Sequence, residues 1–121
     1  MKKSLTKTRL SKKSLRAKAD KLVSQYARSL GRCEWCGSIE SLNWSHGVTR
    51  GWGSLRYEGR NWACLCASCH RKVDQNFTFK WQVWESIKGK EAVEWLQKQR
   101  PQPGILTPKF YEKVIKKYEN T

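Results

Sequence analysis

The stretch NWACLCASCHRK, residues 61–72, holds three cysteines and a histidine within seven consecutive positions. Its last two cysteines, Cys66 and Cys69, form a C-x2-C pair. An earlier pair, Cys33 and Cys36, has the same spacing, and 29 residues separate the two pairs. Two cysteines at this spacing can turn both thiolates toward one ion, and two such pairs complete the closed tetrahedral shell that a structural Zn²⁺ prefers. The pattern therefore predicts a four-cysteine zinc site.

The fifth cysteine, Cys64, is separated from Cys66 by a single residue, which is poor geometry for a metal-binding turn. We interpret Cys64 as a small buried hydrophobic residue. Two alternatives stay open: His70 could replace one of the four cysteines on the zinc, or the cysteines could be a redox pair or unrelated buried thiols. An odd number of cysteines in a Lys-rich chain without a signal peptide favours reduced thiols over disulfides.

Outward from the cysteines, the sequence predicts short strands and then helices. Strands are expected at 41–46 and 61–66, joined by a glycine-punctuated loop, and helices at 69–75, 79–88, 90–99 and after Thr107. An N-terminal helix is expected over 14–31, with Leu15, Leu22, Tyr26 and Leu30 near one face. We expect an α+β fold with a basic N-terminal arm and helix (1–31), a zinc-stapled ββα core (32–78) and a C-terminal helical extension (79–121).

The chain carries 25 Lys and Arg against 10 Asp and Glu, a net charge of +15 that attracts polyanions. Eleven of the basic residues lie in the first 32 positions, where Asp20 is the only acidic residue. We interpret this segment as a cationic arm that contacts phosphates, and a solvated tail without a specific ligand is the alternative. No segment approaches ~20 apolar residues, so we expect a cytoplasmic protein without a membrane partner.

The two histidines of the chain lie on either side of an asparagine. The order is His46, fourteen residues, Asn61, eight residues, His70, and the run is nested between the two cysteine pairs. In this order, and in NWACLCASCHRK above all, the sequence resembles the HNH or His-Me finger endonucleases over roughly residues 33–74. The resemblance implies a small treble-clef-like ββα core in which a strand, a loop, a second strand and a helix form a nuclease site beside the zinc.

The resemblance also implies a role for each of these residues. His46 corresponds to the general base, Asn61 to the residue that fixes the loop and orients the site, and His70 to a ligand of a catalytic divalent ion, Mg²⁺ or Mn²⁺, distinct from the zinc. Phosphodiester hydrolysis needs a base to activate water and a cation to stabilise developing charge. Neutral imidazole, with an unperturbed pKa of ~6.5, suits the first task. Two histidines satisfied structurally near a zinc site are the alternative.

One position departs from the family pattern. Many members carry Asp, Glu or His immediately before the general base as a second metal ligand, whereas this chain has Ser45, whose hydroxyl is a weak ligand. Either His70 holds the metal with water and phosphate oxygens, or Asp74 or Asn61 contributes, or the site is inactive.

A second resemblance covers about residues 30–120. The runs SHGVTRGWGSLRYEGRN (45–61) and CASCHRKVDQN (66–76), followed by EAVEWL (91–96), look like the phage recombination nucleases of the NinG or Rap type, which act on branched DNA. This resemblance implies a phage protein that works in the bacterial host cell. A homing-type, restriction-type or packaging-associated HNH nuclease is the alternative.

Five cations flank the predicted site and are expected to contact DNA. They are Arg50, Arg56 and Arg60 in the loop and Arg71 and Lys72 in the following helix. Contacts to the DNA backbone predict weak sequence preference and steep salt dependence, although one or two of the five could pair with Glu58 or Asp74 instead. Trp52, between two glycines, could stack on an unpaired base or pack the loop.

The remaining tryptophans are expected to pack rather than to bind. Trp35, Trp44 and Trp62 are predicted core residues, and Trp81, Trp84 and Trp95 are predicted to pack the C-terminal helices.

The predicted function is that of a divalent-metal-dependent DNA endonuclease. A non-catalytic zinc-finger DNA-binding module in a nucleic-acid-processing assembly is the first alternative. A protein-interaction module is the second, and it would require exposed C-terminal aromatic residues. A homodimer would suit an endonuclease, because cutting both strands of a duplex usually takes two active sites.

Overall fold

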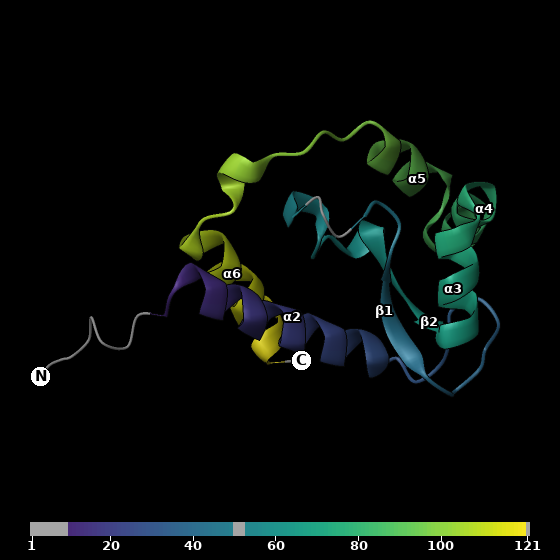
Figure 1. The fold of residues 1–121 in the computed structure, drawn as a ribbon, viewed down its shortest axis with the longest axis horizontal. Helices are drawn as coiled ribbons and strands as arrows, with labels where there is room; N and C mark the ends of the chain where they lie inside the picture. Colours follow the sequence, from purple (N-terminus) through teal and green to yellow (C-terminus); the bar gives the residue numbers. More distant parts are fainter. Residues whose placement is uncertain (1–9, 50–52, 121) are drawn as a thin grey trace, which may run out of the picture.

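A computed structural model describes residues 10–49 and 53–120 of the chain. These residues form five α-helices and one two-stranded antiparallel sheet (Figure 1), which confirms the predicted α+β class. The helices are α2 (Lys12–Arg28), α3 (Ala67–Gln75), α4 (Phe77–Lys88), α5 (Lys90–Gln97) and α6 (Pro108–Glu119), and the strands are β1 (Leu42–His46) and β2 (Trp62–Cys66). Three short 3-10 turns complete the order: η1 (Gly53–Leu55), η2 (Gly59–Asn61) and η3 (Pro103–Ile105).

The two strands form a hairpin at the centre of the fold. Leu42 pairs with Cys66 at one end and His46 pairs with Trp62 at the other. Because side chains alternate along a strand, Trp44 and Ser45 point to opposite faces of the sheet. Each face is covered by a different group of helices, so β1 and β2 contribute to two cores.

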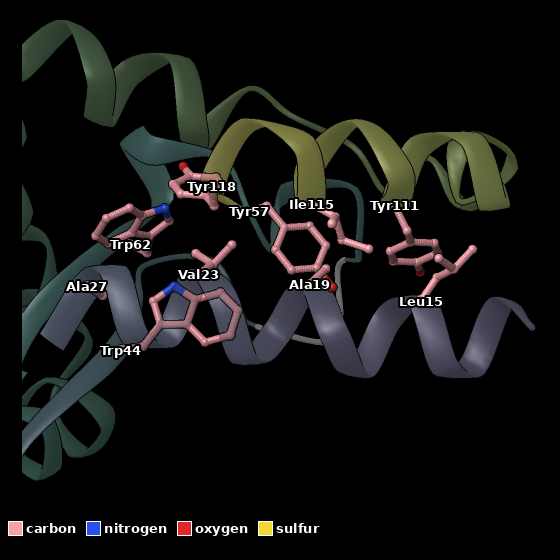
Figure 2. Close-up of a cluster of buried hydrophobic side chains, with 10 residues drawn as sticks. All are labelled: Leu15, Ala19, Val23, Ala27, Trp44, Tyr57, Trp62, Tyr111, Ile115 and Tyr118. Carbon is pink, nitrogen blue, oxygen red and sulfur yellow. The ribbon is translucent and has the colours of Figure 1, made fainter. Parts of the chain in front are cut away.

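The first core lies between the hairpin, α2 and α6, which run side by side (Figures 1 and 2). The buried face of α2 is Leu15, Ala19, Val23 and Ala27, spaced four residues apart. This differs from the predicted face, because Leu30 lies beyond the end of the helix and is 45 % exposed. The residues that α6 and the hairpin region add are Tyr111, Ile115, Tyr118, Trp44, Tyr57 and Trp62.

The second core lies on the other face, under α3, α4 and α5. It contains Ala63 and Leu65 of β2 together with Val73, Trp84 and Leu96 of the three helices. Trp84 is fully buried and its indole N–H donates to the backbone oxygen of Arg60 at 3.1 Å. The described C-terminal helices therefore pack onto the hairpin as predicted.

Two tryptophan predictions have different outcomes. Trp44 and Trp62 are buried, as expected, whereas Trp35 is 41 % exposed and the prediction that it belongs to the core is wrong. The reason is local: Trp35 lies in the turn between Cys33, which is buried, and Cys36, which is exposed, so this turn lies at the surface and leaves its tryptophan only partly covered. No helix among residues 10–49 and 53–120 combines the length and the apolar character needed to cross a membrane.

Candidate functional site

The four cysteines of the two C-x2-C pairs come together in one cluster. The Sγ atoms of Cys33, Cys36, Cys66 and Cys69 all lie within 4.8 Å of one another. The first pair lies in the turn before β1, and the second spans the junction of β2 and α3, where the side chain of Cys66 caps the helix. In each pair the backbone N–H of the later cysteine points at the sulfur of the earlier one at 3.5 Å. The cluster could hold a metal ion such as Zn²⁺, because four thiolates are the donor set of a closed structural zinc site.

Cys64 and His70 stand apart from this cluster. Cys64 is fully buried within β2, and burial, helped by the charge of Glu34, raises the pKa of its thiol to about 11. A neutral buried thiol agrees with the interpretation of Cys64 as packing. The ring of His70 is engaged elsewhere, so the geometry does not favour His70 as a replacement for one of the cysteines.

His46 ends β1 and is 6 % exposed. Its Nε2 lies 2.9 Å from the backbone oxygen of Arg56. A carbonyl oxygen can only accept, so Nε2 carries a hydrogen, and in the neutral form of the ring Nδ1 is the nitrogen without one. The ring centroid of Trp44 lies 4.5 Å away and packs against the imidazole. The orientation and tautomer of His46 are therefore fixed by its surroundings.

Arg56 is buried, which removes it from the predicted DNA-contacting set. Its guanidinium donates to both carboxylate oxygens of Asp20 in α2, at 2.7 and 2.8 Å, and the hydroxyl of Tyr57 donates to the same carboxylate at 2.7 Å. Burial opposes the charged form of Asp20, but the hydrogen bonds from Arg56 and Tyr57 lower its pKa below the ordinary value. Since the carbonyl oxygen of Arg56 accepts from His46, the Asp20–Arg56 pair ties α2 to the turn that holds the histidine.

Asn61 is fully buried and crosslinks the loop between the strands. Its Nδ2 donates to the backbone oxygens of Val48 and Leu55, both at 3.0 Å, and its Oδ1 accepts from the N–H of Val48 at 2.6 Å. The backbone oxygen of Asn61 also accepts from Gly47 at 2.8 Å. Three side-chain hydrogen bonds to backbone groups are the means by which one buried amide fixes a loop.

His70 lies one turn into α3, because the helix begins at Ala67 rather than at Cys69 as predicted. Its Nδ1 is hydrogen bonded to the hydroxyl of Ser45, which is fully buried in β1. Its Nε2 lies 3.2 Å from a carboxylate oxygen of Asp74, one helical turn further on and 53 % exposed. Ser45 therefore contacts the imidazole directly, and Asp74 is the carboxylate nearest to it.

His46 and His70 line one small hollow of about 280 Å³. Its other lining residues are Thr49, Asp74 and Lys80. The ammonium of Lys80 donates to the backbone oxygen of Gly47 at 3.0 Å, next to His46. Sequence reasoning missed Lys80, because one lysine in a Lys-rich chain gives no signal and only the packing of α4 brings it to the site.

The other predicted DNA contacts are dispersed. Arg60 pairs with Glu58 at 2.9 Å and lies over the ring of Trp95, so one of the five cations has the surface partner named as the alternative. Arg71 is exposed on α3, and Lys72 lines a different hollow from the one that holds His70. Arg50 and Trp52 lie outside the described residues.

Comparisons of the chain with protein-family models, with curated proteins and with solved structures found no match.

Proposed function

We propose that this protein is a divalent-metal-dependent endonuclease of the HNH type that hydrolyses phosphodiester bonds in DNA, built on a zinc-stapled ββα core of the His-Me finger kind. The observation that carries the proposal is the position of the His46 ring and the hydrogen bond that holds it. Its tautomer is fixed by the carbonyl of Arg56, and it shares a hollow with His70 and Asp74. An imidazole locked in one tautomer is an arrangement that a general base needs.

The proposed reaction uses the groups that line this hollow. A water molecule attacks the phosphorus atom and gives one proton to Nδ1 of His46, an atom that is buried in this structure. The bond from phosphorus to the leaving oxygen breaks, and the leaving oxygen keeps the bonding electron pair and takes a proton from water. The resulting imidazolium keeps its Nε2–H on the carbonyl of Arg56, which also favours the added positive charge. Asn61 keeps the loop closed around this site through Val48 and Leu55. Lys80 supplies a cation at the hollow, where the charge on a phosphate develops.

The donors around His70 fit a divalent ion such as Mg²⁺ or Mn²⁺. His70 offers one nitrogen and Asp74 one carboxylate, 3.2 Å apart, and Mg²⁺ is commonly held by one or two carboxylates with water and substrate phosphates completing its shell. When bound, such an ion stabilises negative charge on the phosphate and leaving oxygens. Ser45 takes a different role from the acidic residue it replaces, because its hydroxyl holds Nδ1 of His70 and thereby orients the ring.

The test is cleavage of DNA by the zinc-loaded protein. Supercoiled plasmid, a four-way junction and a matched linear duplex are incubated with Mg²⁺ or Mn²⁺, and the junction addresses the likeness to recombination nucleases. We expect nicked or linear products that disappear in His46→Ala. The control is Glu112→Ala, an exposed residue of α6 to which no role in binding or cleavage is assigned, and which should cleave like the parent. No cleavage of any substrate, with folding and zinc content intact, would sink the proposal.

A second candidate is a non-catalytic zinc-finger DNA-binding module. The observation in its favour is Ser45, which occupies His70 with a neutral hydroxyl where many HNH enzymes have a metal-binding carboxylate or imidazole. The two candidates predict different results for the variant Ser45→Asp, which supplies the missing metal ligand. An endonuclease with a working His70–Asp74 site should change its metal requirement, whereas a binding module should show no turnover in either form.

A further inference from the structure

A groove on the far side of α3 from His70 has the chemistry of a nucleotide-binding site. It encloses about 730 Å³, a size within the range of small-molecule sites. It is lined by Trp35, Lys72, Gln75, Asn76, Thr78, Phe79 and Gln82. Trp35 comes from the turn between the first two cysteines, and the other residues come from α3, α4 and their junction.

The aromatic wall of the groove is exposed. Trp35 is 41 % exposed, and its ring meets the edge of Phe79 with centroids 5.7 Å apart and planes at 90°. This contact fixes the indole from one side. A fixed and accessible indole is a surface on which a base can stack, and stacking works for every base because each has a π face.

The polar wall suits the rest of a nucleotide. The lining residues include amide side chains and one ammonium group, and no carboxylate is among the described residues that line the groove. The first turn of α4 also borders the groove; the side chain of Asn76 caps it by accepting from the N–H of Phe79, and the helix end adds partial positive charge beside Lys72. The groove is therefore complementary to an anion that carries a flat apolar ring.

A neighbouring hollow also has aromatic lining residues but differs from the groove in the charges that line it. Its aromatic side chains are the exposed Phe77 and the partly buried Trp81, but its lining contains two carboxylates, Glu85 and Glu94, beside one ammonium group, Lys90. Two carboxylates repel a phosphate. The difference in charge between two adjacent aromatic hollows points to a nucleic-acid strand in the first and not in the second.

From these features we infer that the groove binds an unpaired base and its phosphate in a single-stranded segment of DNA, with the base on Trp35 and the phosphate at Lys72. The inference rests on the proposed function, in which the substrate is DNA. Lys72 and His70 lie two positions apart in α3 and hence on opposite sides of a helix about 10 Å wide. A strand of a few nucleotides that leaves the hollow at His70 and passes around α3 reaches the groove. DNA with an unpaired strand beside the cleavage point is therefore the preferred substrate class.

The experiment measures binding without cleavage. In the zinc-loaded His46→Ala protein, the anisotropy of a fluorescently labelled twelve-residue oligothymidylate is compared with that of a twelve-base-pair duplex. Adding Trp35→Ala should weaken oligothymidylate binding by roughly 10- to 100-fold, as for the loss of one stacked base, and should change duplex binding by less than about twofold because its bases stay stacked. The matched control is Phe77→Ala, from the acidic hollow, which should bind both as the parent does.

Two further variants guard against an effect on the fold. Trp35→Phe keeps an aromatic surface and should retain most of the affinity, with zinc content measured for each protein. Lys72→Gln, which removes one charge and none of the four clustered cysteines, should lower the slope of log affinity against log salt for the single strand by about 0.7, the value for one phosphate contact. Equal oligothymidylate affinity in Trp35→Ala and Phe77→Ala, or an unchanged salt slope in Lys72→Gln, would overturn the inference.

The outcomes separate this inference from the proposed function. If Trp35→Ala loses single-strand binding and the parent protein does not cleave DNA, the groove is supported as a binding site and the endonuclease proposal is rejected. If the parent protein cleaves DNA and Trp35→Ala does not change single-strand binding, the endonuclease proposal is supported and the inference about the groove is rejected. An occupant of another kind, such as a protein segment, would give no single-strand affinity that depends on Trp35.

Discussion

Removing the carboxylate of Asp20 should lower the free energy of unfolding by more than its position in the basic N-terminal segment suggests. The side chain of Arg56 is only 7 % exposed and that of Asp20 is 27 % exposed, and two hydrogen bonds of 2.7 and 2.8 Å join them. Asp20→Ala leaves a buried cation without its counterion and also removes the acceptor of the Tyr57 hydroxyl. Breaking a buried pair in this way costs about 3–5 kcal/mol. Because Asp20 is partly exposed, we expect the lower end, about 3 kcal/mol.

Urea denaturation of the zinc-loaded protein, followed by circular dichroism, measures this loss. The matched control is Lys18→Ala, whose partner Glu119 is at 3.4 Å and whose side chain is 46 % exposed, and which should change the free energy of unfolding by less than about 1 kcal/mol. The double variant Asp20→Leu with Arg56→Met should be more stable than Asp20→Ala, because no charge is left buried. A loss in Asp20→Ala no larger than in Lys18→Ala would refute the reasoning.

The same pair sets a pH dependence. Asp20 has a folded-state pKa below its ordinary value, since the hydrogen bonds from Arg56 and Tyr57 outweigh the effect of burial. The stability it contributes is therefore fully present above its unfolded pKa of about 3.9 and is lost as the pH falls toward the folded value. The difference in unfolding free energy between the parent and Asp20→Ala should be constant at neutral pH and shrink below about pH 4.

Three further outcomes follow from the described contacts. Cys36→Ser should lower bound zinc and thermal stability together, whereas Cys64→Ala should keep the zinc and lose only packing, as metal analysis and thermal melting will show. Asn61→Ala should destabilise the fold by about 3 kcal/mol in urea titrations, because it leaves three buried backbone groups without their partners. Gly47→Ala should cost about 1–3 kcal/mol by the same measurement, because its Cβ would lie 3.0 Å from the indole nitrogen of Trp84.

The parts of this molecule that could be predicted from sequence are those encoded by short spacings. The cysteine cluster depends on two C-x2-C turns, each of which turns its own pair of sulfur atoms, so the four ligands could be named before the fold was known. The strands and C-terminal helices follow from local periodicity in the same way, and the hairpin brings His46 and Asn61 together once both strands are placed.

The parts that could not be predicted depend on contacts between distant residues. Arg56 looked like one more loop cation, because nothing near it in the sequence reveals Asp20, 36 positions away. Trp35 looked like core, because a tryptophan beside a predicted metal ligand usually packs, but the turn from Cys33 to Cys36 lies at the surface and leaves it 41 % exposed. Lys80 reaches the hollow through the packing of α4, which residue type alone does not encode.

The pairing of α2 with α6 determines an order of events during translation. The apolar face of α2 emerges from the ribosome well before Tyr111 and Ile115, so its helical partner is absent while residues 29–107 are being made. The core under α3, α4 and α5 needs nothing beyond Leu96 and can close earlier, beside the four-cysteine cluster. Contacts this far apart in sequence form late and leave apolar surface exposed in the interval. The packing of α2, the first helix of the described residues, is thus completed only after α6 has been made.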